Sequence, residues 1–272
     1  MKLGVRAHDF GRQTAAQLAK SIKNAGFECV QLAPAKGIEG INHFNDITDA
    51  HLHDIHAAFA QNNVEITVLG CYIEPSLADT AARLEQVEIF RNNLSHAKNL
   101  GVNLVGTETT HLPITATESE REAAYQRLKD SVLRMVEQAE KENVFVGIEP
   151  VADHTLNTPE LARRLLDEVN SIRLKIIFDP VNLILPATVG AQAQIFNRAI
   201  TLLGADVMAM HIKDITIENE QKVWCNISTG VIDYTSITEW LRKNHPNMRL
   251  LREEVRMDSY AQDLEAMKKF II

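Results

Sequence analysis

The sequence has few cysteines and no long apolar run. Its 272 residues include three widely spaced cysteines, Cys29, Cys71 and Cys225. An odd, dispersed set argues against a disulfide framework and for a reducing compartment, for which the cytoplasm is the default. No apolar run approaches the roughly 20 residues of a membrane span, and the first ten residues lack the apolar core of a signal peptide. A membrane partner is therefore not expected.

The sequence also lacks Gly/Ser-rich linkers, low-complexity segments and blocks of like charge. No internal boundary is indicated, so a single domain over residues 1–272 is expected. The formal net charge is −8, and Lys and Arg are scattered singly along helical segments. Nucleic acid is disfavoured as a partner, because a protein that binds its backbone would normally show a basic stripe.

Apolar runs of strand length alternate with helical segments along the whole chain. Eight strand-helix units can be counted, and such alternation implies a parallel sheet. A chain of 272 residues has the usual length for a barrel that closes around one core. The predicted fold is therefore α/β, a (β/α)8 TIM barrel with eight parallel strands inside and helices outside. A long loop is expected between the seventh strand and Gly230.

Four successive predicted strands each end on a side chain that can bind a metal ion. VFVGI leads to Glu149, LKIIF to Asp179, VMAM to His211, and MRLLR to the pair Glu253 and Glu254. Strand ends at the carboxyl face of a (β/α)8 barrel share one mouth, so these side chains would converge there. One carboxylate at a strand end is more often a helix cap or a surface residue. Four such endings in order favour a metal site.

Strand parity favours Glu253 over Glu254 as the ligand from the eighth strand. If Glu253 faces the barrel interior, Leu251 faces it too, and Arg252 points towards the helices or solvent. If Glu254 faces inward, Arg252 must lie buried below it.

The expected ligand set is three carboxylates and one imidazole. This set suits Mn²⁺, Mg²⁺ or Co²⁺ better than structural zinc, which prefers thiolates and closed tetrahedral coordination. We expect one divalent cation, Mn²⁺ in the first place, with Mg²⁺, Co²⁺ and Zn²⁺ as alternatives.

The motifs IEP, FDPVN, HIKD followed by GVIDY, and LREE together resemble the xylose-isomerase-like barrel superfamily. They are most similar to its sugar isomerase and epimerase branch, which includes the ketose 3-epimerases. GCYIEP and GTET extend the resemblance over essentially the whole chain. The resemblance implies a metal-dependent enzyme that acts on a small-molecule sugar. Barrels of this family are often dimers or tetramers, so it leaves a homodimer or a homotetramer open.

The resemblance also implies roles for the matched positions. In the epimerases four such residues hold one divalent cation, and the two glutamates, here Glu149 and Glu253, lie on opposite faces of the sugar. The cation stabilises an enediolate by placing positive charge where negative charge develops. One carboxylate removes the proton next to the carbonyl, and the other returns a proton to the opposite face. Glu149 and Glu253 are therefore the expected catalytic residues.

Two positions depart from the ketose-epimerase pattern. Asn182 stands where the epimerases carry a histidine, and it cannot act as an acid near neutral pH. The epimerases lack Lys213, which by parity points inward like His211 and could contact a substrate hydroxyl, carboxylate or phosphate. The side chains that we expect at the mouth as candidate substrate-binding residues are His8, Glu108, His154, Asn182 and Lys213.

The leading hypothesis is a metal-dependent isomerase or epimerase of a small sugar or sugar derivative. An inosose-type dehydratase or lyase would use the same site and expel a hydroxyl from the enediolate. A phosphodiesterase similar to the AP endonucleases would need a cluster of metals and several more histidines than the predicted mouth contains. The substrate itself stays open.

Overall fold

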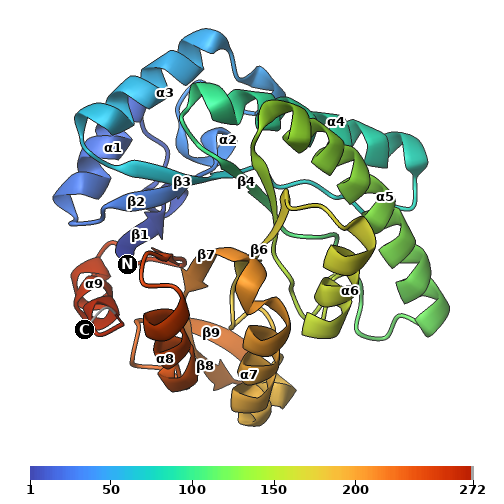
Figure 1. Cartoon of the computed structure of the whole chain (residues 1–272). Coiled ribbons are helices and arrows are strands. Elements are labelled where there is room, and N and C mark those ends of the chain that lie inside the picture. Colours follow the sequence, from blue (N-terminus) through green and yellow to red (C-terminus); the bar gives the residue numbers. More distant parts are fainter. Residues whose placement is uncertain (271–272) are drawn as a thin grey trace.

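The computed structural model describes residues 1–270, and it shows the predicted (β/α)8 barrel. Eight parallel strands close in the order β1-β10-β7-β6-β5-β4-β3-β2 (Figure 1). Their bounds are β1 Lys2–Arg6, β2 Cys29–Leu32, β3 Glu65–Gly70, β4 Leu104–Thr107, β5 Phe145–Ile148, β6 Leu174–Phe178, β7 Val207–Ile212 and β10 Arg249–Arg252. Residues 271 and 272 of the predicted 1–272 domain lie outside the described residues.

Helices follow the barrel strands and surround them (Figure 1). Their bounds are α1 Ala15–Asn24, α2 Pro34–Gly37, α3 Asp49–Gln61, α4 Thr80–Asn99, α5 Glu118–Glu142, α6 Pro159–Val169, α7 Gln192–Leu203, α8 Thr235–Asn244 and α9 Tyr260–Lys268. The start of α5 is capped by Thr117, whose side chain accepts a hydrogen bond from the backbone N–H of Glu120. None of the helices in residues 1–270 is long and apolar enough to cross a membrane.

The core has two layers, as the alternation of side chains along a strand requires. The larger layer lies between the strands and the helices. The smaller one fills the barrel, and its members come from six strands: Cys29, Val68, Leu104, Ile177, Ala209 and Leu251. This packed interior leaves the carboxyl ends of the strands as the place where polar side chains can meet.

The segment after β7 differs from the predicted loop. It forms an antiparallel hairpin of β8 (Asp214–Glu218) and β9 (Gln221–Cys225). The two turn residues, Asn219 and Glu220, have positive φ angles of 49° and 59°. A two-residue turn with both φ angles positive is the preferred hairpin turn. The absence of glycine from this turn hid the hairpin in the sequence.

Candidate metal centre and its surroundings

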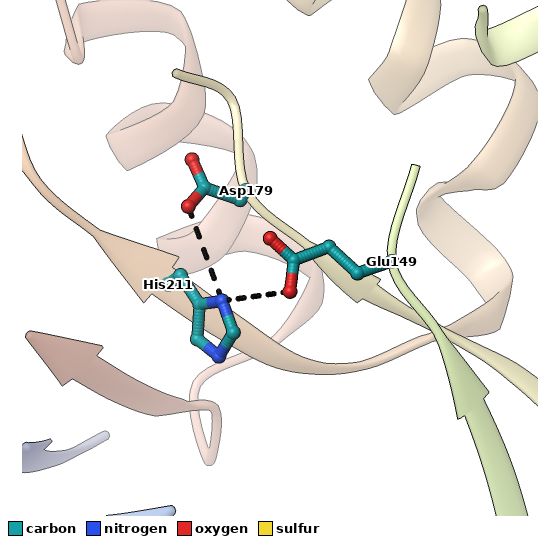
Figure 2. A group of neighbouring side chains, drawn as sticks. All are labelled: Glu149, Asp179 and His211. Carbon is teal, nitrogen blue, oxygen red and sulfur yellow. Dashed lines mark ion pairs between the residues drawn. The ribbon is translucent and has the colours of Figure 1, made fainter. Parts of the chain in front are cut away.

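Three of the predicted metal ligands meet at the carboxyl end of the barrel. Glu149 follows β5, Asp179 follows β6, and His211 lies in β7. Each offers one ligand atom, these atoms lie within 4.8 Å of one another, and all three side chains are buried (Figure 2). Within residues 1–270 this is the one group of three or more such side chains with that geometry.

Asp179 is fixed by the turn that ends β6. Its Oδ1 accepts hydrogen bonds from the backbone N–H groups of Val181 at 2.8 Å and Asn182 at 3.1 Å. The strand ends at Phe178, and Pro180, directly after Asp179, cannot continue it because proline has no N–H to donate to a ladder. These bonds leave Oδ2 directed towards the other ligands, where the ammonium of Lys213 lies 2.7 Å from it.

His211 is oriented by a residue that the sequence analysis missed, Gln31 of β2. The Oε1 atom of Gln31 lies 2.8 Å from His211 Nε2, and its Nε2 donates to the Tyr72 hydroxyl at 2.8 Å. Because the amide of Gln31 presents its oxygen to His211, Nε2 of the ring is the donor and Nδ1 faces the carboxylates. Sequence parity could have identified Gln31, because it lies two residues after the interior Cys29 on an otherwise apolar strand.

Glu149 is held by Asn182. The side-chain amide of Asn182 donates to Glu149 Oε1 at 2.6 Å, and Glu149 Oε2 lies 3.2 Å from His211 Nδ1. The structure therefore places Asn182 against a predicted catalytic carboxylate, as a residue that positions it.

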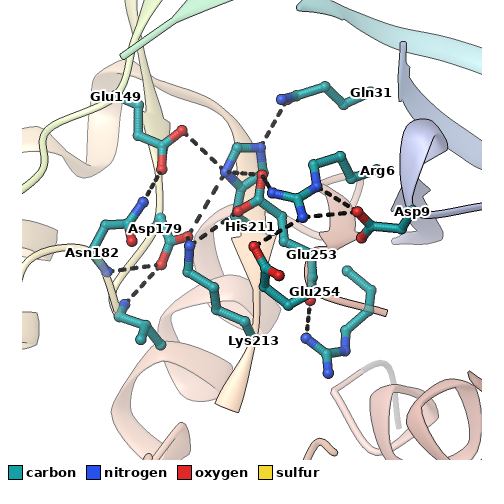
Figure 3. A network of polar contacts seen from close by, with 12 residues as sticks. Arg6, Asp9, Gln31, Glu149, Asp179, Asn182, His211, Lys213, Glu253 and Glu254 are labelled. Atoms are coloured by element: carbon teal, nitrogen blue, oxygen red, sulfur yellow. Dashed lines mark hydrogen bonds and ion pairs between the residues drawn. The ribbon is translucent and has the colours of Figure 1, made fainter. Parts of the chain in front are cut away.

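Glu253, and not Glu254, joins the cluster from the eighth barrel strand (Figure 3). Glu253 is buried, with its Oε1 3.4 Å from His211 Nδ1. Leu251 lies in the barrel interior, and Arg252 turns outward to Asp263 of α9 at 2.9 Å. Glu254 has a left-handed φ of 58° and is paired with Arg6 at 2.9 Å.

Lys213 lies between two of the carboxylates. Its Nζ is 2.7 Å from Asp179 Oδ2 and 3.0 Å from Glu253 Oε2, and its side chain is buried. Arg6 also approaches Glu253, with 3.8 Å between Nη1 and Oε1, so the three buried carboxylates, the ammonium and this guanidinium leave one negative charge when His211 is neutral.

The charged side chains of the cluster shift one another's pKa values. Burial would lower the pKa of His211, but Glu253 and Glu149 outweigh burial and raise it to about 9. Burial would raise the pKa of Glu253, but positive charges led by His211 and Lys213 hold it below its usual range. Burial and the neighbouring carboxylates raise the pKa of Glu149, although His211 opposes the shift. Burial would lower the pKa of Lys213, but the charges of Asp179 and Glu253 outweigh burial and raise it.

The remaining predicted residues lie in different surroundings. The charges of the cluster act on Glu108. Burial is the main cause that raises its pKa, and the charges of Glu149 and Glu253 add to it, so that the pKa reaches about 7. His8 lies edge-on to Tyr72 with ring centroids 6.3 Å apart. His154 packs against His111 with centroids 6.0 Å apart.

A divalent cation fits this cluster on two observations. The ligand atoms of Glu149, Asp179 and His211 converge on one buried point, and the positive charge beside them is the ammonium of Lys213, 2.7 Å from Asp179 Oδ2. Buried carboxylates are costly unless positive charge pairs with them, so a cation among them is favoured. A mixed oxygen and nitrogen donor set with excess negative charge is one that divalent ions take. The residues that could hold the ion are Glu149, Asp179 and His211, with Glu253 beside them.

The chain belongs to the xylose isomerase-like TIM barrel family, whose profile matches residues 19–270. A search of curated proteins gave no match. Among solved structures, a D-tagatose 3-epimerase-like protein is similar at a TM-score of 0.80 and 17% identity, covering 100% of this chain and 97% of that one.

Two further structures show the range within the fold. The probable 3-DHS dehydratase AsbF of Bacillus anthracis has a TM-score of 0.76 at 16% identity, covering 98% of this chain and 99% of that one. The IOLI protein with a bound zinc atom has a TM-score of 0.75 at 17% identity, covering 99% and 96%. At these identities the likeness establishes the common barrel, and the activity must be argued from the site.

Proposed function

We propose that this chain is a divalent-metal-dependent isomerase or epimerase of a small sugar or sugar derivative. The observation that carries the proposal is the convergence of two glutamates on one point. Glu149 follows β5 and Glu253 follows β10. Their atoms Oε2 and Oε1 lie 3.2 and 3.4 Å from the same atom, Nδ1 of His211. Membership of the xylose isomerase-like family and the similarity to an epimerase-like structure support it.

In the proposed reaction a proton leaves the carbon next to the substrate carbonyl and a proton returns from the chain. A divalent cation at Glu149, Asp179, His211 and Glu253 would stabilise the negative charge that develops on the substrate oxygens. Glu149 and Glu253 carry the protons. If the proton returns to the same carbon from the other carboxylate, the product is an epimer. If it returns to the neighbouring carbon, an aldose and a ketose interconvert.

The other residues of the site act through these two. Asn182 fixes the direction of Glu149 through its 2.6 Å hydrogen bond. Lys213 balances the charge of Asp179 and Glu253 and lies where it could reach a substrate oxygen. Glu108 and His8 are proposed to contact substrate at the mouth, and His154 to contact it from the loop after β5.

A dehydratase is the second candidate, and the similarity to a dehydratase structure favours keeping it. Both reactions begin with loss of the same proton, and they differ in whether a hydroxyl leaves. A phosphodiesterase with a metal cluster is less well supported, because residues 1–270 contain one candidate group of ligands.

Proton NMR in D₂O tests the proposal with the Mn²⁺- or Mg²⁺-treated protein and a panel of ketoses, aldoses and inososes. We expect loss of one carbon-bound proton signal together with a new epimer or isomer. Glu149→Gln and Glu253→Gln should each slow the exchange by about 100-fold or more. Glu85→Gln, on the exposed face of α4, is the matched control. A dehydrated product would favour the second candidate, and no exchange with any panel member would contradict the proposal for those sugars.

A further inference from the structure

The hairpin of β8 and β9 turns one of its faces towards the metal centre. Within the hairpin, Lys222 pairs with Ile217 and Trp224 pairs with Ile215. Lys222 and Trp224 are two residues apart on one strand, so both side chains project from the same face. The hairpin lies between β7 and α8 in the chain and packs at the lower edge of the barrel in Figure 1.

Contacts at both positions fix where that face points. Lys222 Nζ donates to the carbonyl oxygen of Val181 at 2.8 Å, two residues beyond Asp179. The ring centroid of Trp224 lies 5.2 Å from Lys213 Nζ, the ammonium that contacts Asp179 and Glu253. The face is therefore one side chain away from the proposed metal ligands.

Both side chains keep surface or charge that the described residues do not pair. Trp224 keeps 38% of its surface exposed although it adjoins the buried Lys213. Lys222 has no carboxylate within 4 Å of its ammonium in the described part of the chain, where its one hydrogen-bond partner is the Val181 carbonyl. Burial lowers the pKa of Lys222 to about 8, although Asp179 opposes the shift. A part-buried ammonium with a neutral partner gains from the arrival of an anion.

We propose that this face is a substrate subsite for an anionic sugar derivative, in which Lys222 binds the carboxylate or phosphate group and Trp224 packs against the sugar ring. Rings of tryptophan supply a large apolar surface with a polar edge, which suits the apolar face of a sugar. Lysine binds phosphate or carboxylate oxygens as a point charge. The assignment rests on the proposed function for the identity of the ligand as a sugar, and it names the substrate class within it.

Binding can be measured through Trp224 itself. The chain has two tryptophans, and Trp240 packs on Phe178 in the core, so Trp240→Phe isolates the fluorescence of Trp224. The Mg²⁺-treated full chain with this substitution is titrated with D-fructose, D-fructose 6-phosphate and 5-keto-D-gluconate. We expect at least one anionic ketose to bind about tenfold more tightly than D-fructose, which is about 1.4 kcal/mol. The other anion then distinguishes phosphate from carboxylate.

Variants test whether Lys222 and Trp224 cause the preference. Lys222→Met should abolish it and leave the affinity for D-fructose within about twofold, whereas Lys222→Arg should retain it. Lys20→Met, an exposed lysine on α1, is the matched control. Calorimetry should show that Trp224→Ala weakens the binding of all three ketoses. Trp224→Phe should restore most of the lost affinity.

The proposal is overturned by equal affinity for the neutral and anionic ketoses, by no response to either anion, or by a preference that survives Lys222→Met. Equal loss of all three ligands in Lys222→Met would also overturn it, because that pattern indicates a structural role through Val181. Proton exchange on neutral ketoses without any anion preference would leave the proposed function standing alone. Anion-selective binding without proton exchange would support the subsite and contradict the proposed function.

Discussion

At the residue scale, the atom that decides what the cluster can bind is Nδ1 of His211. Gln31 controls it from the far side of the ring, because its Oε1 lies 2.8 Å from Nε2 and holds the proton there. Partners of this kind raise ligand basicity and fix ring orientation. The chemistry of the site therefore depends on a residue of β2, although the proposed ligands come from the later strands.

Replacing Gln31 should weaken metal binding without removing a ligand. In Gln31→Met the ring loses its acceptor, and we expect the affinity for Mn²⁺ to fall about 10- to 100-fold by calorimetry. Gln31→Glu retains an acceptor oxygen and should recover part of the loss. Gln61→Met, at the exposed end of α3, should bind the ion like the parent. Unchanged affinity in Gln31→Met would show that the ring is held by packing.

Single residues also show where sequence reasoning reaches its limit. Parity along one strand requires Glu253 and Glu254 to face opposite sides, because side chains alternate whatever the rest of the fold does, and it favours Glu253 as the inward residue. The hydrogen bond from Asn182 to Glu149 joins two different loops, so no local pattern contains it. The pairing of His154 with His111 has the same origin.

At the scale of elements, a glycine of β1 leaves no room for a side chain against β2. Gly4 of β1 pairs with Cys29 of β2. A Cβ atom on Gly4 would lie 2.4 Å from the Cys29 carbonyl oxygen and 2.8 Å from Leu251 Cδ2. The first of these atoms belongs to the backbone of a paired strand, so it cannot rotate away. Any larger residue at this position would have to push β2 or Leu251 aside.

Gly4→Ala should therefore destabilise the barrel. We expect the free energy of unfolding to fall by about 1–3 kcal/mol, the usual cost of overpacking a core, as measured by urea denaturation. Gly190→Ala is the matched control, because a Cβ atom there meets nothing within 4 Å. Equal stabilities for the two variants would mean that β1 and β2 can separate at no cost.

The hairpin shows an element that local pattern did not identify. Its two strands are five residues each, as long as barrel strands β1 and β6, but they are too polar to match the apolar runs that mark most of the barrel. The turn at Asn219 and Glu220 has the required positive φ angles, but glutamate there gives no signal, since L-residues other than Asn and Asp seldom adopt them. The barrel strands were predictable because burial on both faces makes them continuously apolar.

At the scale of the whole molecule, closure of the barrel brings together side chains that are 104 residues apart, from Glu149 to Glu253. The convergence could be predicted from the order of strand endings, because all parallel strands point their carboxyl ends to one face. The distances within the cluster could not, since they depend on the turn after β6 and on Gln31. The result is three buried carboxylates around one imidazole, with Lys213 beside two of them, and a bound cation would compensate the negative charge that remains.

Metal binding should therefore stabilise the whole fold, and more so as the pH rises. In the metal-free protein the pKa of His211 is raised to about 9, above its unfolded value of roughly 6.5. The charged imidazole then contributes stability below about pH 6.5, and this contribution is lost as the pH rises towards 9. A cation must displace the proton from Nδ1, so its apparent affinity rises over the same window.

The difference in Tm between protein with excess Mn²⁺ and protein with EDTA should accordingly increase from pH 6.5 to pH 9, since ligand binding stabilises by RT ln(1 + [L]/Kd). Thermal unfolding followed by circular dichroism measures it. Asp179→Asn should reduce the difference at every pH, whereas Asp54→Asn, on the exposed face of α3, should leave it unchanged. A difference that is independent of pH would place the ion away from His211, and one that survives Asp179→Asn would place it outside the cluster altogether.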